Sequence, residues 1–218
     1  MAEREFYDRK SELETLKEKY AHLKSGEMVV IYGRRRVGKT ELIRQLIKTI
    51  PENKLYFYVD LIGKQGILDS LSASVQEQLK ETVKFSEFDD FLNYIESKSG
   101  KERFILVIDE FQRFLDVAPN FITKLQNYWD SKLKNKKLMI ILVGSSIGMI
   151  QKITSSKAGA LYGRGTKIKI SPFKYSDFRF MFKELNEEEK ILTYSVFGGT
   201  PYYLEKVKKT GGDIYQKI

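Results

Sequence analysis

The chain has 218 residues, of which 42% are hydrophobic and 31% charged, and its formal net charge is +9. This composition is typical of a folded globular protein and excludes an intrinsically disordered chain. With no cysteine and a single histidine, His22, the sequence excludes disulfides, thiolate chemistry and a histidine metal cluster. We therefore expect any metal ion to be held by oxygen atoms.

The N-terminal stretch MAEREFYDRK is charged and lacks the apolar core of a secretory signal. The apolar runs FILVI and LMIILV are too short to span a bilayer. We expect a soluble, cytoplasmic protein with no membrane partner. The positive charge favours an anionic partner: a nucleotide, a nucleic acid or an acidic protein surface. Two local basic runs, 132–137 and 206–209, fit solvated helix ends better than they fit such a binding surface.

Predicted elements alternate along the first half of the chain. Apolar residues recur every three or four positions between residues 8 and 26, which predicts an amphipathic helix that stops at Gly26. The run MVVIYG, residues 28–33, predicts a buried strand. Residues 40–50 then predict a helix that Pro51 ends.

The same alternation continues toward the middle of the chain. Residues 54–60 and 103–110 predict strands, and residues 64–83 and 87–98 predict the helices between them. A helical stretch interrupted by Pro119 follows the second of these strands.

Two further strands are predicted at residues 138–146 and 166–173, with a short helix between them. Five near-continuous apolar strands separated by helices indicate a parallel α/β sheet covered on both faces. After Pro172 the pattern predicts about three helices joined at a GGTP turn. We therefore expect a core over residues 1–172 and a small helical lid over residues 173–218.

The stretch GRRRVGKT follows the first strand and has the spacing of a phosphate-binding loop. In such a loop backbone N–H groups surround the phosphates, the lysine reaches the β and γ oxygens, and the hydroxyl binds Mg²⁺. A following helix N-terminus strengthens the site. The predicted nucleotide-binding residues are Gly33, Arg34, Arg35, Arg36, Val37, Gly38, Lys39 and Thr40. The three arginines are expected to act through their amides, with guanidinium groups facing solvent, an acidic neighbour or a partner.

Asp109 and Glu110 end the third apolar strand. Asp109 is predicted to hold Mg²⁺ together with Thr40, and Glu110 to orient or deprotonate an attacking water, which favours hydrolysis. Ser145 and Ser146 end the fourth strand. If that strand lies between the first and third, a hydroxyl there could sense the γ-phosphate or position the water. The alternative is that each serine caps the following helix.

The stretches FYDRKSELETL, GRRRVGKT, VIDEFQRF, VGSS, LYGR and FGGTPYYL, in this order, resemble the archaeal P-loop ATPase family related to the AAA+ and STAND groups. The resemblance covers most of the chain. It implies a P-loop NTPase fold: a five-stranded parallel sheet of order 5-1-4-3-2, sandwiched by helices, with a C-terminal helical lid. It also implies ATP and Mg²⁺ as cofactors, with Asp8, Arg9 and Pro201 on the adenine side.

The same resemblance draws attention to Arg164, because related ATPases carry an arginine here that can neutralise the γ-phosphate, often across a subunit boundary. That implies self-association. The alternative is that Arg164 pairs with a local acid. Members of the family usually continue into a winged-helix domain. This chain stops at Ile218, which leaves two alternatives. Either the chain is a fragment, which would leave the DNA-contacting or effector part missing and could leave the lid truncated, or it is complete and something else supplies that part.

Three functions fit these observations. The first is an ATP-hydrolysing switch or motor. The second is a nucleotide-gated module that binds DNA or a protein and hydrolyses ATP very slowly. The third, a P-loop kinase, is less favoured, because Glu110 supports water as the nucleophile and no acceptor-pocket motif is evident.

Overall fold

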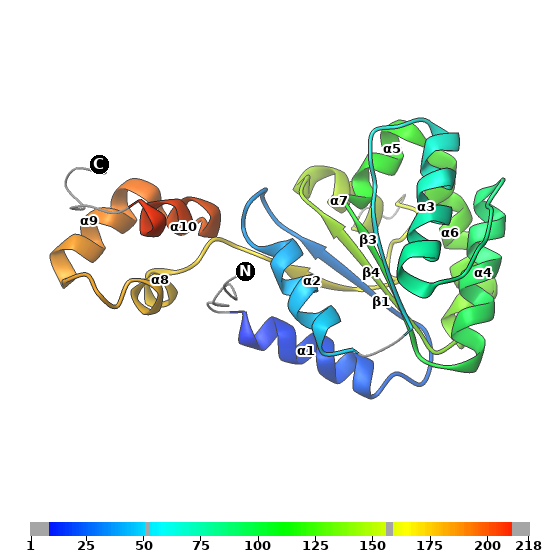
Figure 1. The fold of residues 1–218 in the computed structure, drawn as a ribbon, viewed down its shortest axis with the longest axis horizontal. Coiled ribbons are helices and arrows are strands. Elements are labelled where there is room, and N and C mark those ends of the chain that lie inside the picture. Colours follow the sequence, from blue (N-terminus) through cyan, green and yellow to red (C-terminus); the bar gives the residue numbers. More distant parts are fainter. Residues whose placement is uncertain (1–8, 51–52, 156–158, 211–218) are drawn as a thin grey trace.

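The core of the protein is a five-stranded parallel sheet, seen in a computed structural model that describes residues 9–50, 53–155 and 159–210 (Figure 1). The strand order is β2-β3-β4-β1-β5. The predicted order 5-1-4-3-2 is therefore confirmed, and the fourth strand lies between the first and the third. The strands are β1 (Glu27–Tyr32), β2 (Lys54–Tyr58), β3 (Phe104–Asp109), β4 (Leu138–Gly144) and β5 (Thr166–Lys169).

Burial along the strands follows their position in the sheet. Every residue of β3 and β4 is buried, as expected for central strands of a parallel sheet with helices on both faces. The edge strand β5 has no fully buried residue. The apolar runs in the sequence thus correspond to strands that are covered on two sides.

Helices cover both faces of the sheet (Figure 1). One face packs against α1 and α2, and the other against the helices from α3 to α7. Among the described residues no helix is long and apolar enough to cross a membrane. The helices are α1 (Lys10–Ala21), α2 (Lys39–Lys48), α3 (Lys64–Leu79), α4 (Phe88–Lys101), α5 (Phe114–Val117), α6 (Pro119–Ser131) and α7 (Ile147–Thr154), with single 3₁₀ turns at Phe111–Arg113 and Leu133–Asn135.

Two helix boundaries have clear local causes. The helix predicted to reach residue 83 ends at Leu79, because Lys80 adopts a left-handed conformation with φ of 58°. The predicted interruption at Pro119 separates α5 from α6, and Pro119 is the first residue of α6. Proline is tolerated there because the first helical N–H needs no partner within the helix.

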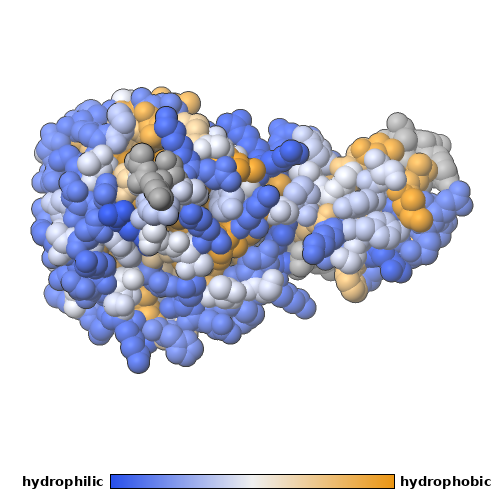
Figure 2. Space-filling view, turned by 180° about the vertical axis from the view of Figure 1, so that it is seen from behind, coloured by the Kyte–Doolittle hydropathy of each residue, from blue (hydrophilic) through white to orange (hydrophobic). Residues whose placement is uncertain are grey.

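Three helices follow the sheet: α8 (Tyr175–Met181), α9 (Glu187–Phe197) and α10 (Pro201–Lys209). We call them the lid. They form a hydrophobic cluster of their own, in which the rings of Phe178 and Phe182 stack with centroids 4.7 Å apart. Figure 2 shows the lid as a smaller lobe beside the larger core lobe. An extended segment, residues 170–174, joins the two lobes.

Candidate nucleotide-binding and catalytic site

A pocket of about 620 Å³ opens where the carboxyl ends of the central strands meet the lid. Because the strands are parallel, the residues that follow β1, β3 and β4 reach the same edge of the sheet. Lys39 and Thr40 line the pocket from the loop after β1, and Glu110 lines it from the end of β3. Tyr202 and Lys206 of α10 line the side that belongs to the lid.

Two glycines determine the conformation of the phosphate-binding loop, and its lysine forms hydrogen bonds to two carbonyl oxygens of the loop. Gly38 has a φ of 96°, in the left-handed region that favours glycine, and precedes the first turn of α2. A Cβ at Gly33 would lie 2.1 Å from the carbonyl oxygen of Ile170, so no larger residue fits. The Nζ of Lys39 donates to the carbonyl oxygens of Gly33 and Arg34, each at 2.9 Å.

Burial and nearby carboxylates act in opposite directions on the pKa of Lys39. Only 6% of Lys39 is exposed. Burial lowers the pKa of its ammonium group, while the nearby carboxylates of Glu110 and Asp109 act in the opposite direction. The Nζ of Lys39 thus lies between carbonyl oxygens at the positive end of the α2 dipole, where phosphate oxygens would be favourable partners.

The arginines of the loop differ in what they contact. Arg34 and Arg35 are exposed. Arg36 has a φ of 70°, and its Nη1 donates to the hydroxyl of Tyr203 at 3.0 Å. Its guanidinium group also lies over the ring of Tyr202, 4.3 Å from the centroid. The sequence predicted solvent, an acid or a partner for this side chain, and the structure places it on the lid.

The predicted metal ligands lie side by side. The Oγ1 of Thr40 donates to Oδ2 of Asp109 at 3.2 Å, and Asp109 is 2% exposed. The backbone N–H of Glu110 donates to the other oxygen, Oδ1, at 2.9 Å. Among the described residues no group of three or more His, Cys, Asp or Glu could hold a metal. One hydroxyl and one carboxylate still fit Mg²⁺, which binds few protein oxygens and takes the rest from water and phosphates.

A tyrosine that the sequence analysis missed completes this carboxylate's contacts. The hydroxyl of Tyr56 on β2 donates to Oδ2 of Asp109 at 2.7 Å. Burial first, and then the negative charge of Asp109, raises the pKa of the Tyr56 phenol. The signal in the sequence is weak, since β2 contains two tyrosines and either becomes a candidate only when β2 is known to pair with β3.

Glu110 is held by two donors that come from different elements. The Oγ of Ser145, just after β4, donates to Oε2 of Glu110 at 2.7 Å. The Nε2 of Gln112 donates to the same oxygen. Gln112 was not among the predicted site residues, although it lies two positions after Glu110. Ser146 occupies the N-cap position of α7, where its side chain makes no capping hydrogen bond.

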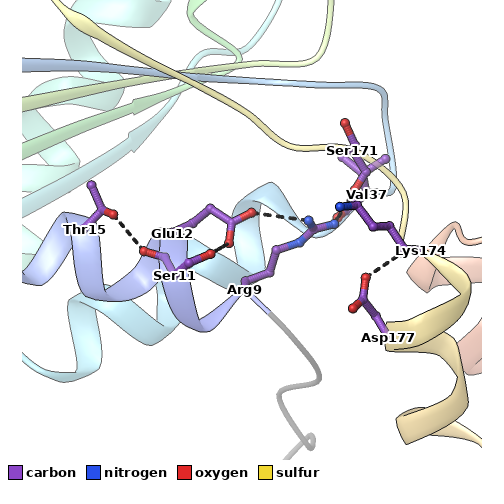
Figure 3. Close-up of polar contacts among 8 residues, drawn as sticks. All are labelled: Arg9, Ser11, Glu12, Thr15, Val37, Ser171, Lys174 and Asp177. Carbon is purple, nitrogen blue, oxygen red and sulfur yellow. Dashed lines mark hydrogen bonds and ion pairs between the residues drawn. The ribbon is translucent and has the colours of Figure 1, made fainter.

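Arg9 ties the N-terminal helix to the phosphate loop and to the segment that leads into the lid (Figure 3). Its Nη2 donates to the carbonyl oxygens of Ser171 and, at 3.5 Å, Val37. Its guanidinium group lies 5.1 Å from the centroid of the Phe173 ring. Pro201, the other described residue predicted on the adenine side, begins α10 and lines the pocket. Asp8 lies outside the described residues.

Comparison with known proteins places this geometry in a family. Residues 6–207 match the model of an ATPase domain found predominantly in Archaea. The chain belongs to this family. The chain is 35% identical over 213 residues to an uncharacterised protein of Methanocaldococcus jannaschii, in a match that covers 97% of this chain. The chain spans 46% of the length of that relative.

Solved structures share the fold of this chain. A Walker-type ATPase of Pyrococcus abyssi superposes with a TM-score of 0.66 at 21% identity, covering 96% of this chain and 69% of that one. The ORC2 protein of Aeropyrum pernix, solved in ADPNP and ADP complexes, gives a TM-score of 0.66 at 16% identity, covering 94% of this chain and 62% of that one. At these identities the likeness shows the fold alone.

Arg164 lies away from the pocket. It precedes β5, which runs parallel to β1, so it lies near the start of β1 while the phosphate loop follows the end of that strand. Its Nε and Nη2 donate to the two carboxylate oxygens of Asp130, at 2.9 Å and 2.6 Å. The local acid named as the alternative thus exists. A role for Arg164 in a neighbouring subunit stays a prediction and would require this pair to open.

Proposed function

We propose that this chain binds ATP with Mg²⁺ and hydrolyses it, and that it acts as a nucleotide-driven switch or motor. The observation that carries the proposal is the contact of Glu110 with Ser145 at the wall of the pocket that also contains Lys39 and Thr40. This contact supports Glu110 as the base that takes a proton from water beside the phosphate-binding site. Membership of an ATPase family favours ATP as the nucleotide.

Phosphate binding rests on the loop after β1. Its backbone N–H groups and the N-terminus of α2 offer donors to the phosphate oxygens. The Nζ of Lys39 exchanges the carbonyl oxygens of Gly33 and Arg34 for oxygens of the β- and γ-phosphates. This exchange is favourable because a buried ammonium group gains charged partners in place of neutral ones.

Thr40 and Asp109 would hold Mg²⁺, which when bound offsets negative charge on the β- and γ-phosphates. Within the protein, the Tyr56 hydroxyl keeps Asp109 in place through its hydrogen bond to Oδ2. The backbone N–H of Glu110 holds the other oxygen of the same carboxylate. The carboxylate is therefore oriented from two sides.

Glu110 orients the attacking water and accepts its proton. As the water oxygen forms a bond to the γ-phosphorus, the bond between that phosphorus and the bridging oxygen breaks, and its electron pair stays with ADP. Ser145 fixes the Glu110 carboxylate by donating to Oε2. Catalysis in this scheme consists of positioning and charge stabilisation, with no covalent intermediate.

Phosphate release from MgATP by three proteins tests the proposal: wild type, Lys39→Ala and Glu110→Gln. We expect Lys39→Ala to lose tight ATP binding, and Glu110→Gln to keep ATP affinity but lose about 100-fold or more in kcat. Matched controls are Lys98→Ala and Glu81→Gln, which alter an ion pair between α4 and the loop after α3. Equal turnover by wild type and Glu110→Gln would exclude Glu110 as the base.

The second candidate function, a nucleotide-gated module for DNA or a protein, is favoured by the cations around the mouth of the pocket. Arg35 and Arg44 line it on the core side, and Lys206 and Lys209 line it on the lid side. Affinity for double-stranded DNA should then fall steeply with salt and change when ATP is added. If DNA affinity depended on neither salt nor ATP, DNA binding would have no support and the hydrolytic switch would remain the favoured function. Transfer of labelled γ-phosphate to an acceptor would instead indicate a kinase.

A further inference from the structure

Gln112 is a buried amide that contacts Glu110, a residue lining the pocket, and only one of its two ends has a hydrogen-bond partner among the described residues. It is 4% exposed. Its Nε2 donates to Oε2 of Glu110 and lies 3.4 Å from Oγ of Ser145. Its Oε1 is buried and accepts no hydrogen bond within the described part of the chain. Rotating the amide would bring its oxygen against the Glu110 carboxylate, so the present orientation is the favourable one.

Two unfavourable features therefore meet at Glu110, in a closely packed part of the site. The acceptor of Gln112 is buried without a donor, which destabilises a fold. Glu110 itself has a φ of 56°, in the left-handed region that residues other than glycine rarely adopt. Gly144 lies against the same amide, since a Cβ there would approach Oε1 of Gln112 to 2.7 Å. Such strain persists where a side chain is retained for function.

We infer that Gln112 is a positioning residue for the catalytic base. Its amide and the Ser145 hydroxyl both donate to Oε2 of Glu110, so one carboxylate oxygen is anchored twice. The other oxygen, Oε1, is then left in a defined direction to accept the proton of the attacking water. This inference rests on the proposed hydrolysis. Gln112 would affect the rate of hydrolysis by holding Glu110 in position, without contacting the reacting atoms.

Gln112→Leu separates positioning from a purely structural role. Leucine has a similar size and removes both the donor and the unsatisfied acceptor, so the folded state should be at least as stable as the wild type. We expect kcat to fall about 10- to 100-fold, the loss that a small misplacement of a reacting group causes. The Kd for ATP should stay within about twofold, because Glu110 acts on water and not on binding.

Gln65→Leu is the matched control. The Gln65 amide also donates to a carboxylate, that of Asp69 at 2.9 Å, but it lies on the exposed side of α3. Its kcat should equal that of the wild type. A loss of kcat in Gln112→Leu that is accompanied by a lower unfolding midpoint and a weaker ATP affinity would overturn the inference, as would an unchanged kcat.

A double-mutant cycle makes the test specific to Glu110. If Gln112 acts through Glu110, then adding Gln112→Leu to Glu110→Gln should not lower the residual rate further. Two independent, multiplying losses would overturn the inference. The proposed function is tested separately: it fails if the wild type releases no phosphate, or if Glu110→Gln is as fast as the wild type. If Gln112→Leu keeps the wild-type kcat while Glu110→Gln loses it, the role of Gln112 is refuted and the proposed function stands.

Discussion

The guanidinium group of Arg36, in the phosphate-binding loop, lies 4.3 Å from the centroid of the Tyr202 ring on the lid helix α10. Lys206 of the same helix places its Nζ 4.8 Å from that ring. Arg36 also donates to the Tyr203 hydroxyl. The loop that would surround the phosphates and the helix that covers the pocket are thus connected by a side chain that the sequence motif leaves variable.

Replacing Arg36 should loosen the lid. A cation–π contact between exposed groups is worth about 0.5–1 kcal/mol, so Arg36→Ala should raise the Kd for ATP about two- to fivefold and speed hydrogen exchange in α10. Arg34→Ala is the control, because it removes the same charge from an exposed position of the same loop. Equal losses of ATP affinity in both variants, measured by titration with a fluorescent ATP analogue, would indicate a charge effect and not a contact with the lid.

Tyr56→Phe should weaken the response to Mg²⁺. The phenol hydroxyl donates to the carboxylate of Asp109 at 2.7 Å, and a hydrogen bond to a charged group is worth about 1.5–3 kcal/mol. We expect the Mg²⁺ concentration that half-saturates the increase in ATP affinity to rise about four- to twelvefold, if about half of that energy is lost. ATP affinity in EDTA should not change.

Tyr94→Phe provides the matched control for Tyr56→Phe. Its hydroxyl donates to Glu81 at 2.9 Å, and burial raises the pKa of this phenol too, with Glu81 adding to the rise. Glu81 does not line the pocket. Tyr94→Phe should therefore leave the Mg²⁺ requirement unchanged. The same increase in both variants would mean that Tyr56 affects stability and not the metal site.

The pair of Arg164 with Asp130 should contribute a pH-dependent stability. Hydrogen bonding to Arg164 lowers the pKa of Asp130 below its ordinary value of 3.8. Because the folded-state pKa is the lower one, the stabilisation is present above pH 4 and is lost as the pH falls through the folded-state value. Asp130→Asn should therefore cost about 0.2–1 kcal/mol at pH 7, as partly exposed ion pairs do, and progressively less as the pH falls below 3.8. Urea unfolding at neutral and at acidic pH measures this, and an equal cost at both would contradict it.

Turnover at different protein concentrations tests whether Arg164 also serves a neighbouring subunit. If it reaches a second molecule's γ-phosphate, turnover per molecule should rise with protein concentration, and Arg164→Ala should remove the rise. Asp130→Asn should not lower turnover in that case, because it frees Arg164 from its local partner. Turnover that is independent of concentration and survives Arg164→Ala would restrict Arg164 to its ion pair with Asp130.

Much of the fold could be predicted because its signals are local. Strands β3 and β4 are buried on both sides, so their apolar runs are continuous and bounded by polar residues. The interruption at Pro119 also follows from local chemistry, since proline lacks the N–H that a helix interior needs. The predicted end of α3 was wrong for the opposite reason: no local residue preference indicates that Lys80 adopts the left-handed conformation that ends the helix.

The sequence by itself determined which residues follow the strands: the phosphate loop after β1, and Asp109 and Glu110 at the end of β3. Glycine spacing and strand ends are properties of neighbouring residues, so a motif can record them. Only the tertiary structure decided that Tyr56 contacts Asp109, that Ser145 and not Ser146 reaches Glu110, and that Arg36 lies on the lid. These contacts join elements that are distant in the chain, and their side chains meet only because of the strand order and the position of α10.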